Sequence, residues 1–452
     1  MSAIITTKFR YENAKGFIDS VASGSLYLFL GKSDPWSSSL SVTTDGSAPT
    51  PVDTIVEEND ARQNMLATKK VTTSDVINIA PRHTWTSGNS YVPWDDADDT
   101  IFTKSFYVIT DEFKVYKCIK AGTGASTVKP TQTNVNPTTE GDGYQWKYMF
   151  TVFTTDSAKF LTNNYMPVKT IALASGQVIG DLSADNQTKY QFQIDSSANA
   201  GKIYRYVVTN GGTGYSNTPT VTVVGNGTGA QATATVVGGI ITAINVNGSN
   251  YGSGYSNAYV TITDGTGSNA TARAVLSPAN GHGTDPVREL GAYYTGVAIR
   301  LEYAEGSGDF IVNNSFRQIG LLKNPYNYGT TTVSTSTTLS ALRQLHCSAH
   351  SGFAVGDYIT GGTSGAIAFI DAYDVPTGNI KYHQNDKTGY TAFQASETIT
   401  GHTAGSGTIA ASGGLLNPEV DRFSGQLTFL ENRAPINRSA SQIEEIKIIV
   451  EF

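Results

Sequence analysis

Three neighbouring residues carry side chains that could bind a metal ion. His346 and His350 stand four positions apart, which would place both on one face of a helix, and Cys347 adds a thiol beside them. A structural zinc site needs four such ligands, and no second cluster of cysteine or histidine in the sequence completes this one. We therefore interpret the segment as a partly buried helix end and expect no metal.

Two glycine-containing segments resemble loops that hold nucleotides. Gly31-Lys32-Ser33 has the ending of a phosphate-binding loop, but Leu26 stands where that loop needs its first glycine. The apolar run 26–30 predicts a strand, whereas the motif requires a flexible loop. The second segment, 225–230, lies between strand-like runs instead of opening a helix. We expect no nucleotide and no other cofactor.

Acidic residues raise two further possibilities. Asp95, Asp96, Asp98 and Asp99 form a dense group of oxygens that could hold calcium, but the glycine of a calcium-binding loop is missing, so we favour a solvated turn. Hydrolysis has no support either, because no serine lies in a Gly-x-Ser-x-Gly elbow and spacing alone identifies no carboxylate pair. The sequence predicts no catalytic residues and no enzymatic activity.

Composition limits the kind of protein further. Of 452 residues, 39% are hydrophobic and 15% are charged, which suits short strands joined by many turns. The net charge of −7 and the absence of a long Lys or Arg run argue against nucleic-acid binding. Cys118 and Cys347 are far apart, and we expect both to be buried free thiols. The start of the chain lacks the apolar core of a signal peptide, and we expect no membrane insertion.

Hydrophobic patterning predicts a mainly β protein with few helices. Only 60–68 and 338–347 follow helical spacing. The predicted strands are short, rich in β-branched or alternating apolar residues, and bounded by turn formers. They cover residues 25–31, 100–109, 114–119, 144–152, 296–303 and 443–452.

Two internal duplications have a spacing of about forty residues, which is typical of repeated supersecondary units. The first matches Tyr215 with Tyr255, and the second matches Asp357 with Glu397. We expect each copy of the first repeat to form a small β-hairpin element. Short strands of Thr, Val, Ile and Ala need neighbours to bury their faces, so both pairs should form compact β-modules inserted into a larger scaffold, over residues 171–286 and 332–416.

Several short motifs occur in a fixed order along the chain. They lie at residues 7–10, 29–38, 81–85, 115–118, 141–150, 316–319, 324–325, 424–425, 431–436 and 444–446. In this order they resemble the baseplate wedge family called gene product eight of T-even-type contractile-tailed bacteriophages. The resemblance covers roughly residues 1–170, 290–330 and 415–452. The repeat modules are extra to that family and are similar to modules in structural proteins of phages that infect marine cyanobacteria.

The resemblance implies a fold of two β-sandwich-like domains, one inserted in the other, with extra small β-repeat modules. We expect a scaffold domain over 1–85, 287–331 and 417–452, an inserted domain over 86–170, and repeat insertions over 171–286 and 332–416. The motif residues expected to hold the scaffold or its interfaces are Asp34, Pro35, Trp36, Arg82, Trp85, Asp142, Tyr144, Trp146, Arg317, Glu431, Asn432 and Arg433. Trp36 and Trp146 are hypothesised to brace the scaffold, and residues 431–433 to fix a turn at the last strand pair.

The same resemblance implies a structural function. It points to a homodimer that binds other wedge proteins around a central hub, that is assembled in the host cytoplasm, and that resides in the virion tail baseplate without a small-molecule substrate. One alternative is a tail adhesin that binds host surface glycans through the repeat modules. Another is a polysaccharide hydrolase, which is supported only by acidic residues that have no identified partner.

Overall fold

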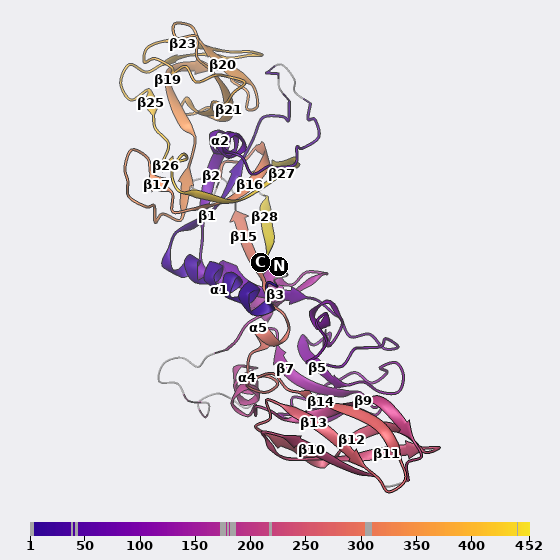
Figure 1. Cartoon of the computed structure of the whole chain (residues 1–452). Coiled ribbons are helices and arrows are strands. Elements are labelled where there is room, and N and C mark those ends of the chain that lie inside the picture. The colour runs from indigo at the N-terminus through magenta and orange to yellow at the C-terminus, as the bar shows by residue number, and fades with distance from the viewer. Residues whose placement is uncertain are drawn as a thin grey trace. The chain divides into compact units, whose positions relative to one another are not determined.

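The computed structural model describes residues 4–37, 39–40, 44–171, 178, 180, 187–216, 219–302, 310–440 and 442–452; Ser38 of the motif 29–38, Tyr303 of the predicted strand 296–303 and parts of 171–286 lie outside these ranges. The chain divides into two compact units, each built from distant segments (Figure 1). Unit 1 comprises Met1–Lys15, Ile77–Gly296 and Ile449–Phe452, and unit 2 comprises Gly16–Val76 and Val297–Ile448. Strands dominate, so the predicted mainly β fold is confirmed.

Unit 2 contains an antiparallel sheet with the strand order β18-β2-β1-β16-β27. The predicted strand 25–31 is confirmed as β1, and all of its residues are buried because both faces of this central strand are covered. Tyr27 and Phe29 pack with Met65, Leu322 and Val420 in the core. The strands are β1 (Leu26–Gly31), β2 (Met65–Val71), β16 (Asn314–Lys323), β18 (Thr338–Ser340) and β27 (Gln426–Arg438).

The helix predictions are mostly wrong. Helix α2 (Ile55–Gln63) overlaps the start of 60–68, but β2 begins at Met65. The segment 338–347 forms β18 and the start of β19 (Arg343–Ser351), because pairing with neighbouring strands overrides its helical spacing. Helix α1 (Thr7–Ser23) was not predicted, since most of its side chains are polar and only Ala14 and Val21 are buried. Within the described ranges, no helix is long and apolar enough to cross a bilayer.

Unit 1 contains a second antiparallel sheet with the strand order β4-β5-β7-β6. The predicted strands 114–119 and 144–152 are confirmed as β5 and β7. Of 100–109, only the end is a strand, because residues 101–103 form a short 3₁₀ turn. The predictions 296–303 and 443–452 are confirmed as β15 (Tyr294–Glu302) and β28 (Ile443–Glu451), over their described residues. The other elements are β3 (Val76–Pro81), β4 (Tyr107–Ile109), β5 (Lys114–Lys120), β6 (Thr138–Thr139), β7 (Gln145–Thr151), α3 (Thr154–Phe160), β8 (Tyr165–Val168), α4 (Gln187–Ser196) and α5 (Pro286–Glu289).

The first repeat pair forms one module of six strands whose two copies exchange strands. Each copy supplies three strands, β9 to β11 and β12 to β14. The first strand of each copy pairs with the last strand of the other, and the two middle strands pair with each other, so the expectation of one hairpin per copy is wrong. The strands are β9 (Ile203–Thr213), β10 (Thr220–Gly225), β11 (Thr228–Val237), β12 (Ile240–Ser253), β13 (Ala258–Thr263) and β14 (Ser268–Leu276).

The matched tyrosines of this module are both buried, each against glycines of both copies. A Cβ on Gly267 would lie 2.4 Å from Cγ of Tyr215, and a Cβ on Gly227 would lie 2.4 Å from Cγ of Tyr255. Only a residue without a side chain allows either ring to lie so close to the backbone. The repeated Gly and Tyr positions are therefore packing determinants of the strand exchange.

Gly267→Ala is expected to destabilise the module by about 1–3 kcal/mol, because the new methyl group overlaps the buried Tyr215 ring. Protection of the β9 and β14 amides in hydrogen exchange measures this loss. Gly265→Ala is the control, because a Cβ there has no neighbour within 4 Å. Equal protection in the two variants would contradict the assigned role of Gly267.

The second repeat pair forms a seven-stranded sheet with the order β22-β21-β20-β23-β24-β19-β25, closed into a small barrel by a β22–β19 pairing. The copies interlock here too, because β20 pairs with its counterpart β23. Glu397 accepts backbone N–H bonds from Thr363 and Ser364 of the other copy, and Asp357 accepts one from Thr403. The remaining strands are β20 (Tyr358–Gly361), β21 (Ile367–Asp374), β22 (Asn379–His383), β23 (Thr398–Gly401), β24 (Ser406–Ile409) and β25 (Leu415–Leu416), with the pair β17 (Tyr326–Asn327) and β26 (Val420–Asp421) preceding and following them.

Candidate functional sites

The motif residues singled out in the sequence gather in two clusters, one in each unit. We call the first the unit 2 cluster and the second the unit 1 cluster. The unit 2 cluster contains Asp34, Pro35, Trp36, Arg317, Glu431, Asn432 and Arg433, and the unit 1 cluster contains Arg82, Trp85, Asp142, Tyr144 and Trp146.

Asp34 lies at the centre of a buried charge network where the chain leaves β1. Its side chain is 0% exposed, and its Oδ2 accepts from Nζ of Lys32 at 2.7 Å and from Nζ of Lys387 at 2.5 Å. Burial alone would raise the pKa of Asp34. The hydrogen bond with His383 and the charges of Lys32 and Lys387 nevertheless hold that pKa well below its usual range.

His383, at the end of β22, lies between two carboxylates. Its Nε2 is 3.4 Å from Oδ1 of Asp34, and its Nδ1 is 2.8 Å from Oδ2 of Asp371. Burial would lower the pKa of His383, but the charge of Asp371 and the hydrogen bonds to both carboxylates raise it to about 9. At pH 7 the imidazole is therefore charged, and it links β21 and β22 of the second repeat module to the loop after β1.

Sequence reasoning identified Asp34 but missed its partners. Lys387 is 353 positions away from Asp34. Asp371 is 338 positions away from Ser33 and accepts a hydrogen bond from the Ser33 hydroxyl at 2.5 Å. No local spacing could reveal contacts of that kind. Residues 383–387 are all polar, and this run is the local signal that could have pointed to the segment.

The other residues of the unit 2 cluster connect the loop after β1 to β27, to the second repeat module and to β16. The indole N–H of Trp36 donates to the carbonyl of Arg433 at 2.8 Å. The carbonyl of Pro35 accepts from Nζ of Lys387 at 2.7 Å. The buried guanidinium of Arg317 pairs with Asp45, with Nη2 to Oδ2 at 2.8 Å.

Strand β27 itself carries the three-residue motif at 431–433. Asn432 donates to Glu57 at 3.0 Å and accepts from Gln318 at 2.9 Å, and the carboxylate of Glu431 is 3.8 Å from the guanidinium of Arg433. These residues lie inside β27 and away from its ends, so the expectation that they fix a turn at the last strand pair is wrong. Their side chains tie β27 to β16 and α2.

Trp36→Phe is expected to lower the free energy of unfolding of unit 2 by about 0.5–1.5 kcal/mol, because it removes the hydrogen bond to Arg433 and keeps an aromatic ring. Trp36→Ala should cost more, since the ring contacts are lost as well. Chemical denaturation measures both. Phe423→Ala is the control, because that ring is 54% exposed. Wild-type stability in Trp36→Ala would contradict the bracing role.

The unit 1 cluster organises the turn before β7. Asp142 accepts backbone N–H bonds from Thr127 at 2.8 Å and Val128 at 3.0 Å. Desolvation raises the pKa of Asp142, but these bonds outweigh it and lower the pKa. The ring of Tyr144 stacks on the fully buried ring of Trp146 at 5.7 Å between centroids.

Arg82 and Trp85 hold the segment that follows β3. The guanidinium of Arg82 donates to the carbonyl of Thr162 at 2.8 Å, and the indole N–H of Trp85 donates to Oγ of Ser126 at 3.1 Å. Ser126 in turn donates to Asp142 at 3.1 Å. The two motifs at 81–85 and 141–150 therefore form one connected structure.

Unit 1 also contains a buried ion pair, which the sequence analysis did not predict. Nζ of Lys117 lies 2.9 Å from Oε2 of Glu289 and 3.9 Å from the ring centroid of Trp94, and Lys117 is 0% exposed. Burial would raise the pKa of Glu289, but Lys117 lowers it to about 2. Burial and the charge of Lys117 lower the pKa of neighbouring His282 to about 4, so His282 is neutral at pH 7.

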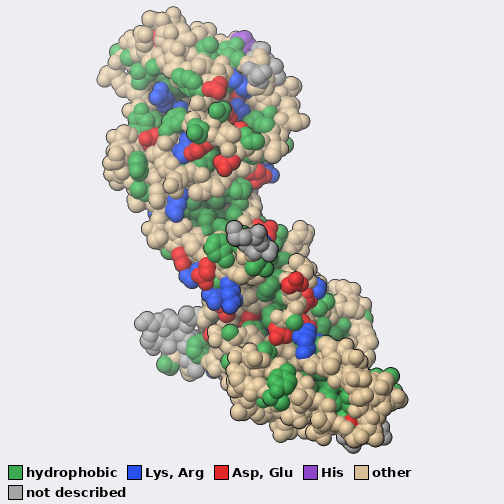
Figure 2. Space-filling model, in the orientation of Figure 1, with side chains coloured by type: hydrophobic (Ala, Val, Ile, Leu, Met, Phe, Trp, Pro, Cys, Tyr) green, Lys and Arg blue, Asp and Glu red, His purple; other side chains and the backbone are tan. Residues whose placement is uncertain are grey.

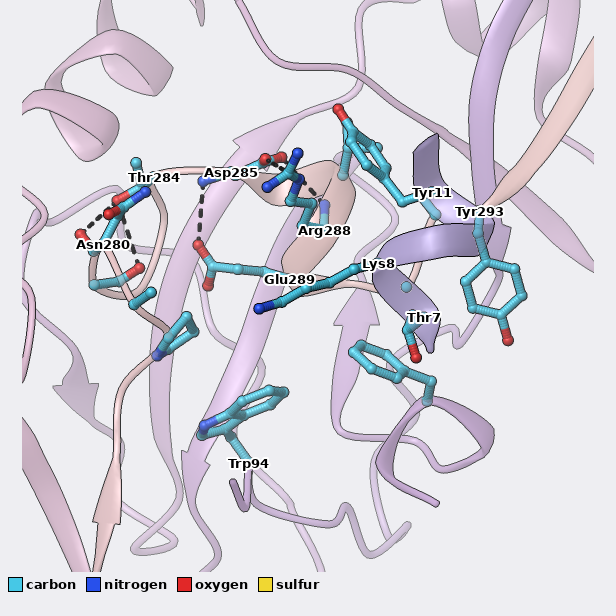
Figure 3. A pocket seen from close by; sticks show the side chains of 17 residues that line it. Thr7, Lys8, Tyr11, Trp94, Asn280, Thr284, Asp285, Arg288, Glu289 and Tyr293 are labelled. Carbon is cyan, nitrogen blue, oxygen red and sulfur yellow. Dashed lines mark hydrogen bonds and ion pairs between the residues drawn. The ribbon is translucent and has the colours of Figure 1, made fainter. Parts of the chain in front are cut away.

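A cavity of about 370 Å³ lies in unit 1 between the start of α1 and α5, and Glu289 is among its lining residues (Figure 3). Its lining is largely apolar, with the rings of Tyr11, Trp94, Phe102 and Tyr293. Lys8 also lines the cavity, and its side chain extends from α1 toward it. The cavity offers shape and apolar surface for a ligand but no paired nucleophile and base.

The remaining sequence candidates have structural partners. Asp95 pairs with Arg205 and Arg273, and Asp98 with Lys104, so part of the acidic group 95–99 forms ion pairs. His346 and His350 lie on β19 rather than on a helix, and bond to Asn379 and Tyr373 respectively. In the part of the chain that the structure describes, no group of three or more His, Cys, Asp or Glu residues could hold a metal ion.

Both cysteines are free and buried, as predicted. Burial raises the pKa of the Cys347 thiol to about 11 and also raises that of Cys118. Neither thiol is therefore ionised at pH 7, and neither is a reactive nucleophile.

Part of the chain is similar to known proteins. Residues 3–121 match the family model described as "Bacteriophage T4, Gp8". The chain is 27% identical to the baseplate wedge protein gp8 of Enterobacteria phage T4 over 202 residues, which are 37% of this chain and 60% of the T4 protein. The chain thus spans less than two thirds of the length of that relative. The resemblance to gp8-like baseplate wedge proteins that the sequence motifs predicted is confirmed.

Proposed function

We propose that this chain is a structural subunit of the baseplate wedge of a contractile phage tail. The observation that carries the proposal is the match of residues 3–121 to the gp8 family, a range that includes Asp34, Trp36, Arg82 and Trp85. The function is assembly rather than catalysis, and it needs no cofactor. The protein would reside in the virion, after assembly in the host cytoplasm as a homodimer bound to other wedge proteins.

The internal construction of each unit supports this proposal. Buried ion pairs and aromatic contacts join segments that are hundreds of residues apart, as between Lys387 and Asp34 in unit 2. Separating the partners of such a pair leaves a buried charge without its counter-ion, which costs free energy. Partial opening of a unit is therefore unfavourable. Each unit is therefore suited to move as a rigid body while its external interfaces rearrange on tail contraction.

We further propose that the two repeat modules are insertions into the gp8-like scaffold. In both, the first and last strands pair, with Ile203 opposite Leu276 and Leu345 opposite Leu415. The two ends of each module are therefore close together, as insertion of a module into another domain requires. On the face shown in Figure 2, the first repeat module is mostly uncharged.

Light scattering on the purified full chain tests the proposed function. We expect the mass of a dimer, and a larger complex when candidate wedge proteins of a contractile phage are added. A second form that lacks residues 203–276 is the control: it should enter the same complex if the first module is an addition to the scaffold. A monomer that joins no wedge protein would contradict the proposal.

A further inference from the structure

The apolar cavity between α1 and α5 has the size of a binding site. Its volume of about 370 Å³ is within the range of protein pockets that take a small ligand or one large side chain. Trp94, Phe102 and Val287 supply apolar surface from separate parts of the chain. An apolar group that enters this space gains free energy from the surface removed from water.

The walls of the cavity are held in place before any ligand arrives. The indole N–H of Trp94 donates to the carbonyl of Leu276 at 3.2 Å, and Lys117 lies against the face of the same ring. A Cβ on Gly291 would lie 2.5 Å from Cδ1 of Phe102, so glycine at this position lets the Phe102 ring line the cavity. A preformed site loses little conformational entropy on binding.

The charges around the cavity leave one cation unpaired. Arg288 pairs with Glu12 at 2.7 Å and Asp285 at 3.4 Å, and the lining carboxylate of Glu289 is paired with Lys117. Lys8 is exposed and has no hydrogen bond or ion pair to any residue in the described ranges. The lining therefore combines apolar walls with a single available ammonium group, which complements a ligand that is apolar at one end and anionic at the other.

Exposed apolar side chains occur close to Lys8 in the sequence. Ile5, three positions before Lys8, is 66% exposed, and Phe9, one position after it, is 57% exposed. A partner protein can contact apolar side chains outside the cavity, whereas a free small molecule inside the cavity cannot. Exposed apolar residues are common in the interaction sites of proteins.

We propose that this cavity binds an extended segment of a partner protein, which places one large apolar side chain against the rings of Trp94 and Phe102 and an adjacent carboxylate against Lys8. The inference rests on the proposed assembly function for its choice of a protein partner. The chemistry of the site does not depend on that function, because cavity and charge belong to unit 1 alone.

The test uses N-acetyl-L-phenylalaninate and the corresponding amide as probes, with binding to the full chain measured by ligand-observed NMR. We expect the carboxylate to bind about fivefold more tightly than the amide, because one partly exposed ion pair contributes up to ~1 kcal/mol. Lys8→Gln should abolish this preference and Lys8→Arg should keep it. Lys447→Gln, at another exposed lysine, is the control.

A second variant tests the location of the probe. Ala279 is exposed and lines the cavity, so Ala279→Phe should fill the space without disturbing the core, and should weaken binding at least tenfold. Ala411→Phe is the matched control. Unchanged binding to Ala279→Phe, or equal binding of carboxylate and amide, would overturn the proposed site.

A third comparison separates a peptide partner from a free carboxylate. N-acetyl-Ala-Ala-Phe with a free carboxylate should bind more tightly than N-acetyl-L-phenylalaninate, because its additional residues contact protein surface outside the cavity. No gain would overturn the protein partner and leave a site for small carboxylates. Failure of the wedge assembly test would leave both probe results intact, so the two proposals fail separately.

Discussion

Asp34→Asn is expected to lower the free energy of unfolding of unit 2 by about 3–5 kcal/mol, because it leaves buried cations without their shared counter-ion. Lys32, Lys387 and His383 all face this carboxylate, and its side chain is 0% exposed. The substitution preserves the shape of the side chain, so the loss reports the missing charge together with the acceptor oxygen that the amide nitrogen replaces. Urea denaturation, followed by a probe in the second repeat module, measures the effect.

The control for this prediction is Asp53→Asn, an exposed carboxylate of the same unit, which should change the stability little. Equal denaturation midpoints of Asp34→Asn and wild type would show that the network contributes nothing. Loss of cooperativity between the sheet around β1 and the second repeat module would support its role as their link.

The same network predicts a pH dependence. The folded pKa of His383, about 9, is above the value of ~6.5 of an unfolded histidine. Stability from the charged imidazole is therefore fully present below about pH 6.5 and is lost as the pH rises through about 9. His383→Gln should lack this loss, so the difference between the two stability curves isolates the group from Lys32 and Lys387. An NMR titration showing His383 with a pKa below 6.5 would contradict the prediction.

Lys117→Met is the second substitution with a large expected effect, a loss of about 3–5 kcal/mol in unit 1. The methionine fills the space of the lysine stem but leaves the carboxyl group of Glu289 buried without its ion pair. The contact of the ammonium group with Trp94 is lost as well. Thermal unfolding followed by near-ultraviolet circular dichroism of the unit 1 aromatics measures the change.

The double variant Lys117→Met with Glu289→Gln should recover much of this loss, because the buried carboxylate is removed together with its ion-pair partner. Lys129→Met is the control: Lys129 also forms ion pairs, but its partner Asp111 is 77% exposed, and little change is expected. A double variant no more stable than Lys117→Met alone would show that the charge pair is not the cause.

The amino-acid sequence by itself determined the mainly β class, the central strand β1, both duplications and the gp8-like motifs. These features depend on residues close together in the chain, where periodicity, turn formers and motif spacing are visible. The same information placed helix at 338–347, because spacing alone does not show that neighbouring strands will pair with that segment.

Only the tertiary structure decided which residues act together. His383 and Lys387 contact Asp34, and Asp371 contacts Ser33, across more than three hundred positions, and no local pattern marks a contact of that separation. The strands of the two repeat copies have similar β propensity, so their sequences do not show which of them will pair. The exchange of strands between the copies is visible only in the folded module. The cavity beside Lys8 likewise exists only where α1 and α5 come together, since the volume belongs to the packing and not to any one segment.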